Sequence, residues 1–227
     1  MIRKLTALSV TLGVVCILSA LALTVSNARD AKLAGQRSEE AKNELVRILE
    51  AEPPADNIPV HRETEECAED PVLVSDEPAE EIRQTTVEIE QPVTTEMTEV
   101  EIQGHSYIGY LHIPRLELEL PIMADWNYEK LQISPCRYRG STKTGDLVLT
   151  AHNYSHHFGT IQWLQPGDEL EFVDMDNVTT TYRVAASEVV QPTEVDKVKK
   201  SGYALTMFTC TYGGRTRVVV YCDAVEP

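Results

Sequence analysis

Hydrophobic and polar residues follow different patterns at the two ends of the chain. Leu5 to Val25 form an unbroken apolar or weakly polar run, which is long enough to cross a bilayer as a helix. Arg3 and Lys4 precede this run, and cations at that end favour a cytoplasmic N-terminus. The pattern predicts a single-pass transmembrane anchor over residues 1–27 and places the rest of the chain outside the cell membrane.

A cleaved signal peptide is the alternative for this run. It requires a shorter apolar core and a cleavage site with small residues, and Ser26-Asn27-Ala28 offers such a site. Because the apolar run is long for a signal peptide, we favour the uncleaved anchor.

Residues 28–51 show scattered apolar positions among charged ones. Leu33, Leu45, Ile48 and Leu49 lie among charges, and no Pro or Gly follows Gly35. This pattern predicts a solvated juxtamembrane helix.

Residues 52–103 read as an acidic, proline-containing linker. Glu52 to Val100 hold fifteen Asp or Glu against two Arg, which accounts for −13 of the chain's net charge of −16. Like charges and repeated prolines favour an extended spacer without a core. The alternative is a docking tail for a basic partner. The acidity therefore says little about the rest of the chain, and nothing in it indicates binding to nucleic acid.

From Gly104 onward, short runs of β-branched and aromatic residues alternate with Gly, Pro and Asp clusters, as in a mainly β protein. About seven strands predict a barrel or a sandwich over residues 104–227. Short helical turns are expected at 127–133 and 194–200. The predicted strands span 108–113, 116–120, 147–151, 169–173, 180–190, 204–209 and 217–221.

The five cysteines do not form a metal-binding or disulfide pattern. No two lie at C-x-x-C spacing, which makes a zinc site improbable, and their odd number leaves at least one free thiol. We therefore expect no metal and no organic cofactor. The cysteines are Cys16, Cys67, Cys136, Cys210 and Cys222.

Cys210 is the best candidate for a nucleophile. It ends the run ALTMFTC and precedes the turn residues TYGG, so it lies where a strand gives way to a turn that a substrate can approach. Position alone is weak evidence, because most cysteines in apolar runs are small buried residues.

A thiol nucleophile needs an imidazole nearby to accept its proton and later to protonate the leaving amine. His152 closes the run DLVLTAHN and also lies at a strand end. His156 and His157 follow in a polar loop, where solvated surface histidines are the usual case.

Acyl transfer also needs a donor for the oxyanion of the tetrahedral intermediate. Arg215 and Arg217 begin the last predicted strand, two residues apart and on one face of it. A hairpin connected by TYGG would bring Arg217 alongside Cys210. The alternative is that both arginines only keep a strand end soluble.

Together these segments resemble the sortase family. Thr206-Met207-Phe208-Thr209-Cys210 resembles the signature Thr-Leu-x-Thr-Cys, with Met in place of Leu, and Ala151-His152-Asn153 resembles the motif that carries the sortase histidine. The segment 109–114 followed by 118–121 is similar to the opening pair of strands. The resemblance covers residues 108–225, and the order His, Cys, Arg agrees with it.

The resemblance implies an eight-stranded closed β-barrel with His152, Cys210 and Arg217 at one rim. It implies a cysteine transpeptidase that cleaves an Leu-Pro-x-Thr-Gly-like sorting signal of surface proteins through a thioester. An amine of a peptidoglycan precursor or a pilin lysine would resolve that thioester. Arg217 is preferred to Arg215 because it directly precedes Val218-Val219-Val220.

Arg215, Asn153 and Thr209 are further candidates for substrate binding. Asn153 is similar to class B sortases, but the long helical insertion of that class has little room between Glu188 and Ala204. No Asp-Pro-aromatic lid precedes the barrel, so the class stays open. We expect Cys222 to be a buried structural thiol.

Phe158 and Trp163 are expected in the core. Two other functions remain open: a hydrolytic cysteine protease with the same Cys and His, and a non-catalytic, membrane-anchored β-barrel that binds envelope components.

Overall fold

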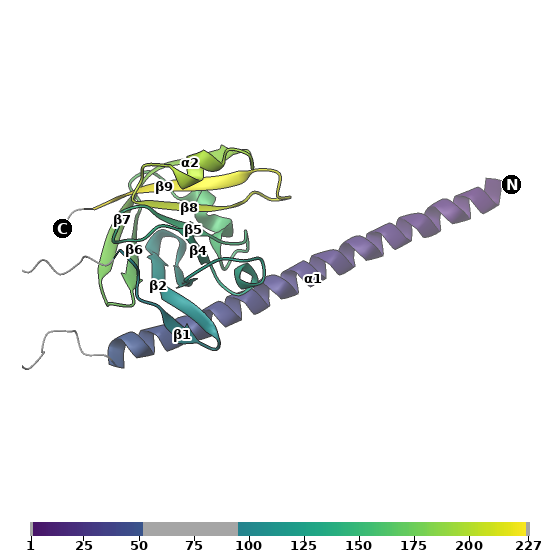
Figure 1. Ribbon diagram of the computed structural model, residues 1–227. Coiled ribbons are helices and arrows are strands. Elements are labelled where there is room, and N and C mark those ends of the chain that lie inside the picture. Colours follow the sequence, from purple (N-terminus) through teal and green to yellow (C-terminus); the bar gives the residue numbers. More distant parts are fainter. Residues whose placement is uncertain (1, 52–94, 226–227) are drawn as a thin grey trace, which may run out of the picture. The chain divides into compact units, whose positions relative to one another are not determined.

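The computed structural model describes residues 2–51 and 95–225, with side chains from residue 13 onward in the first range (Figure 1). Helix α1 (Ile2–Ala51) covers both the predicted anchor and the predicted juxtamembrane helix without a break. It is long and apolar enough to cross a membrane by length and composition. Most of the predicted linker, residues 52–94 with Cys67, lies outside the described residues.

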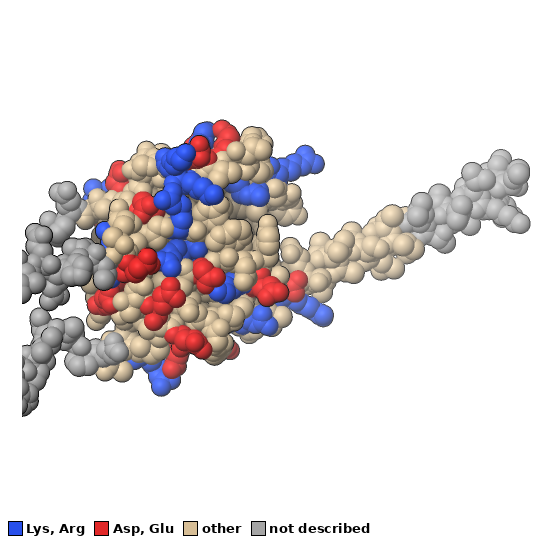
Figure 2. All heavy atoms as spheres, viewed as in Figure 1, with Lys and Arg blue, Asp and Glu red and all other residues tan. Residues whose placement is uncertain are grey.

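The two halves of α1 differ in what surrounds their side chains. From Val14 to Val25 the large apolar side chains are exposed, and Figure 2 shows this stretch without charged residues. Further along, one face is buried; its members are Ala34, Ser38, Ala41, Leu45 and Leu49. These positions recur every three or four residues, as a helix stripe packed on a core requires. The helix predicted as solvated is therefore amphipathic, and one face of it packs on the barrel.

The described part of the chain from Val100 onward holds nine strands in one sheet. They are β1 (Val100–Ile102), β2 (His105–Ile113), β3 (Leu118–Met123), β4 (Cys136–Arg139), β5 (Leu147–Thr150), β6 (Glu169–Asp174), β7 (Thr179–Val190), β8 (Leu205–Cys210) and β9 (Arg217–Ala224). The short helices are η1 (Pro114–Leu116), η2 (Lys130–Gln132), η3 (Phe158–Trp163) and α2 (Val195–Lys199).

Strands β2 to β9 close into an eight-stranded mixed barrel, because β2 pairs with β3 on one side and with β6 on the other. The order is β1-β2-β3-β4-β5-β8-β9-β7-β6. Most pairs are antiparallel, whereas β3 and β4 are parallel and so are β5 and β8. The predicted closed barrel with short helices is confirmed.

Two strands were not predicted from the sequence. β4 reads Cys-Arg-Tyr-Arg and is only four residues long, too short for its alternation to indicate a strand, and β1 lies in the stretch that was assigned to the linker. β1 pairs with the start of β2, and Met97 before it is buried. The folded part therefore begins before Gly104, the expected start of the domain.

Apolar side chains form separate clusters inside and outside the barrel. The interior cluster includes Ile108, Leu111, Phe172 and Val220. An outer cluster packs Leu45 and Leu49 of α1 against the barrel, and Leu131 of η2 belongs to it. Phe158 lies in the interior as expected, but Trp163 is 60% exposed, so its assignment to the core is wrong.

Candidate active site

Cys210 and His152 lie at the same level on neighbouring strands. β5 and β8 are parallel, with Thr150 opposite Phe208, and each of the two residues follows its strand partner by two positions. The Thr209 hydroxyl donates a buried hydrogen bond of 2.8 Å to the carbonyl of Ala151. The residues directly before the thiol and the imidazole are thereby joined.

Arg217 lies opposite Cys210, because the two form the last register pair between β8 and β9. The turn between them needs positive φ at Gly213 (81°) and Gly214 (72°), which glycine adopts without a Cβ clash. Nη1 of Arg217 donates to the carbonyls of Gly214 and Thr216, each at 3.0 Å. The guanidinium is thus held by the turn.

His152, Cys210 and Arg217 all line one cavity of about 180 Å³. Aromatic side chains make up much of the rest of its wall: Trp126, Tyr128, Tyr138 and Phe208. Tyr138 packs edge-on against Phe208 with ring centres 5.3 Å apart. The cavity therefore combines a thiol, an imidazole and a permanent cation with an apolar surface that suits an extended peptide.

The three further candidates for substrate binding occupy different places. Thr209 lines the cavity, but its hydroxyl is committed to Ala151. The amide of Asn153 donates to the carbonyl of Thr211 at 3.4 Å and joins the loop after β5 to the turn after β8. Arg215 is exposed in that turn and does not line the cavity.

Burial determines the protonation of the histidines near the site. It lowers the pKa of His152, which favours the neutral imidazole that accepts a proton. His157 is fully buried, contrary to the expectation of a solvated loop residue, and burial together with repulsion from His152 lowers its pKa to about 4. His156 is exposed and lies against Gly35 of α1.

The remaining thiols of the barrel are isolated from this chemistry. Cys222 is buried in the interior cluster, and burial raises the pKa of its thiol to about 12. Cys136 is buried in the outer cluster with its pKa raised to about 12 for the same reason. Among the side chains that the structure describes, no three His, Cys, Asp or Glu are grouped to hold a metal ion.

Sequence reasoning missed the aromatic wall of the cavity. Trp126 and Tyr128 come from the connection between β3 and β4, and Tyr138 comes from β4, a strand that was not predicted. The sequence places several aromatic residues between 126 and 138, which could have indicated a binding surface. Which of them line the Cys210 cavity depends on the pairing of β4 with β5.

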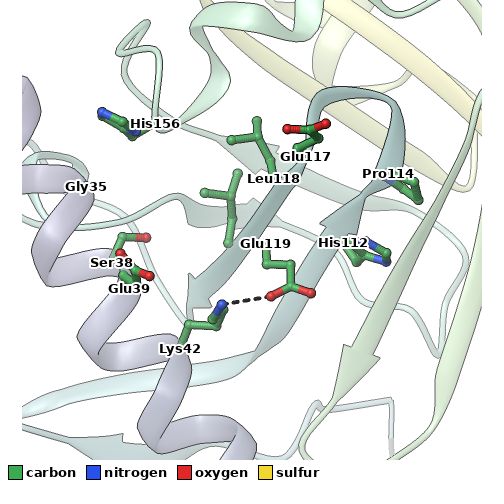
Figure 3. A pocket seen from close by; sticks show the side chains of 11 residues that line it. Gly35, Ser38, Glu39, Lys42, His112, Pro114, Glu117, Leu118, Glu119 and His156 are labelled. Carbon is green, nitrogen blue, oxygen red and sulfur yellow. Dashed lines mark hydrogen bonds and ion pairs between the residues drawn. The ribbon is translucent and has the colours of Figure 1, made fainter.

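A larger cavity, of about 560 Å³, lies between α1 and strands β2 and β3 (Figure 3). Lys42 of α1 and Glu119 of β3 form an ion pair of 2.8 Å across it. None of Cys210, His152 and Arg217 lines this cavity, so it is separate from the candidate site.

A family model described as a sortase domain matches residues 111–225, just over half of the 227 residues. No curated protein matches the chain.

Several solved structures are similar to the chain. Sortase C from Clostridium perfringens SM101 is 23% identical with a TM-score of 0.46, over 58% of this chain and 73% of that one. Sortase A from Corynebacterium diphtheriae is 20% identical with a TM-score of 0.49, over 54% and 62%. Sortase C1 from Streptococcus suis is 24% identical with a TM-score of 0.47, over 54% and 75%.

Proposed function

The chain belongs to the sortase family, whose members are cysteine transpeptidases, and from that premise we propose that Cys210, His152 and Arg217 are its catalytic residues. One observation carries the assignment: these three side chains line a single cavity at the ends of β5, β8 and β9. A nucleophile, a proton carrier and a fixed cation are what acyl transfer requires in one place.

In the first step the Cys210 thiolate attacks the carbonyl of the scissile peptide bond, after its proton has passed to His152. Arg217 stabilises the oxyanion or holds the substrate backbone. The C–N bond then breaks, His152 gives its proton to the leaving amine, and a thioester remains on Cys210. An acceptor amine attacks the thioester, His152 takes the proton of that amine, and a new amide bond releases the enzyme.

The substrates under this proposal are surface proteins with a C-terminal sorting signal like Leu-Pro-x-Thr-Gly. The aromatic and aliphatic lining of the cavity supports an apolar donor segment. The acceptor is an amine of a peptidoglycan precursor or of a pilin lysine. The apolar half of α1 stays attached as a membrane anchor and keeps the barrel on the outer face of the membrane.

A hydrolytic protease with the same residues is the second candidate, since water can replace the amine. The experiment that separates the two uses a quenched sorting-signal peptide, with and without an amine acceptor. Mass spectrometry distinguishes hydrolysed product from amine adduct. A non-catalytic binding module would give neither product.

Replacing Cys210 by Ala should abolish both cleavage and adduct formation. Cys222→Ala is the matched control, because that thiol is buried in the interior cluster and lies outside the cavity. It should keep activity and cost only the stability of a small cavity. Full cleavage by Cys210→Ala would refute the proposed mechanism.

A further inference from the structure

The imidazole of His152 lacks the partner that usually orients a catalytic base. In a pair of a thiol and an imidazole, the base is commonly held in place by a third group. Burial is the influence that lowers the pKa of His152, and no hydrogen bond or charge from a described residue contributes to the shift. The orientation of this ring therefore has to come from packing.

Tyr154 provides the packing contact. Its ring centre lies 5.0 Å from that of His152, with 35° between the ring planes. The same tyrosine packs on the fully buried His157, with ring centres 5.6 Å apart. Aromatic pairs at this spacing favour particular relative orientations. Tyr154 is half-buried and does not line the Cys210 cavity, so it contacts the proposed base without facing the substrate.

The loop after β5, which carries both rings, is closely packed. The carbonyl of His152 accepts a hydrogen bond of 3.2 Å from the N–H of Phe158. The carbonyl of Tyr154 accepts hydrogen bonds from the N–H groups of His157 at 3.0 Å and Gly159 at 2.9 Å. A Cβ on Gly159 would lie only 2.7 Å from that same Tyr154 oxygen. Because close-packed structure transmits strain, a displacement at one point of this loop changes the position of the rest.

Helix α1 contacts this loop at Gly35. A Cβ on Gly35 would lie 2.9 Å from Cγ and 3.1 Å from Cβ of His156, and Figure 3 shows His156 next to this turn of the helix. Glycine weakens the interior of a helix, and the close approach of His156 is a structural reason for it here. Burial and the charge of Asp30, also on α1, raise the pKa of Tyr154. The helix therefore acts on the loop at two points.

We propose that Tyr154 is a positioning residue, which holds the ring of His152 in the orientation that proton transfer requires. Helix α1 in turn holds the loop in place through the contact between Gly35 and His156. The inference rests on the proposed role of His152 as the proton carrier. It makes the helix that carries the apolar run a determinant of catalytic rate, because small misplacements of a catalytic group cost large factors in rate.

The first test uses the full-length protein in detergent and measures cleavage of the quenched sorting-signal peptide. Tyr154→Leu keeps an apolar side chain but not the flat ring, and it should lower kcat roughly threefold to tenfold, the usual contribution of an aromatic pair expressed as a rate. KM should change little, because Tyr154 does not line the cavity. Tyr154→Phe keeps the ring and should retain most of kcat. Equal losses in the two variants would rule out a role for the ring.

A second readout follows the imidazole itself by NMR. The pKa of His152 is measured from its Cε1–H resonance, which is identified as the one missing in His152→Gln. Tyr154→Leu should admit water to the ring and raise this pKa toward its ordinary value of about 6.5, whereas Tyr154→Phe should leave it unchanged. An unchanged pKa in Tyr154→Leu would contradict the packing contact. The other titratable or charged groups around His152 are the same in all these variants: His157, Cys210, Arg217, Tyr128 and Tyr138.

The contribution of α1 is tested with Gly35→Leu, whose side chain would displace His156. This variant should lower kcat at unchanged KM, and His156→Ala in the same chain should restore kcat by making room for the leucine. Gly13→Leu is the matched control on the same helix, because a Cβ there meets nothing within 4 Å. If Gly35→Leu and Gly13→Leu had equal kcat, α1 would have no part in positioning the loop.

The outcomes separate this inference from the proposed function. If wild type cleaves no peptide, the proposed function fails, while the titration of His152 still decides whether Tyr154 packs on its ring. If wild type cleaves and both Tyr154→Leu and Gly35→Leu keep the full kcat, the inference is wrong and the proposed function stands. Circular dichroism of each variant checks that the fold is intact.

Discussion

The register between β8 and β9 explains why Arg217 rather than Arg215 is the arginine of the candidate site. Arg217 pairs with Cys210, and its Nη1 is fixed by two carbonyls of the turn. Arg215 lies within the turn and is exposed. A rigid cation at a fixed position costs less reorganisation in the transition state than a mobile one.

Arg217→Lys should therefore lower kcat for peptide cleavage by about 100-fold, the scale of losing an oxyanion donor, because the charge stays but the planar fork is lost. Arg215→Lys should change kcat little. Steady-state cleavage of the quenched peptide measures both, and circular dichroism checks the fold. A severe loss in Arg215→Lys with a silent Arg217→Lys would reverse the assignment.

His157 is a buried imidazole whose two ring nitrogens have no hydrogen-bond partner among the described residues. It packs on Tyr154 with ring centres 5.6 Å apart, and His152 and His156 are the nearby titratable groups that oppose its charge. The Ile133 carbonyl favours the charged form, although it makes no hydrogen bond of normal geometry to the ring; burial outweighs it and lowers the pKa to about 4. The folded protein therefore keeps His157 neutral in mild acid.

The lowered pKa of His157 makes the free energy of unfolding fall as the pH falls. Between the ordinary pKa of about 6.5 and the folded value of about 4, the unfolded chain binds a proton that the folded chain does not, so acid favours unfolding. From pH 7.5 to pH 5, wild type should lose about 2 kcal/mol more than His157→Phe. Urea unfolding at both pH values measures this. The exposed His156→Gln is the control, and its pH dependence should stay close to that of wild type, because His156 is the smallest of the influences on the pKa of His157.

Helix α1 has two parts with different surroundings. From Gly13 to Val25 it is exposed and apolar, whereas its second half presents a buried stripe to strands β1 to β3 and to η2. Leu45 is fully buried in the outer cluster, and Leu131 of the same cluster also lines the Cys210 cavity. The helix thus supports the connection that forms one wall of the candidate site.

Leu45→Ala should lower the free energy of unfolding by about 2–5 kcal/mol, as expected for a truncated core leucine. Leu33→Ala on the same helix is the matched control, because Leu33 is 50% exposed and its loss should cost little. Urea unfolding of the full-length protein in detergent gives both values. If the two variants were equally stable, the stripe would not pack on the barrel in solution.

For the molecule as a whole, the start of the folded part decides which fragment is stable. Met97 and Ile102 are each 5% exposed, and β1 pairs with β2 ahead of Gly104. A fragment 104–227 loses both side chains, each worth about 1.5–3 kcal/mol when buried.

Fragment 104–227 should therefore unfold at a lower temperature than fragment 95–227 and cleave peptide less well when warmed. Calorimetry of the two fragments measures the difference, with fragment 28–227 as a reference that keeps the buried face of α1. Equal midpoints for the two shorter fragments would mean that β1 adds nothing to the fold.

Much of the candidate site could be predicted from local sequence. Cys210 and His152 each end an apolar run, and strand alternation separates Arg217 from Cys222. The aromatic wall could not be predicted. Trp126 and Tyr138 line the cavity because of the path of the connection before β4 and the irregular register of β4 itself. Neither feature has a period that a sequence pattern reveals.

The sequence by itself determined the apolar anchor run, the β character after Gly104 and the order His, Cys, Arg, because each depends on neighbouring residues and their spacing. Only the tertiary structure decided that the second half of α1 packs on the barrel, that His157 is buried, and that Trp126 and Tyr138 line the Cys210 cavity. Those outcomes depend on contacts between segments distant in the chain, and burial of a side chain is fixed by what packs over it rather than by its own sequence neighbours.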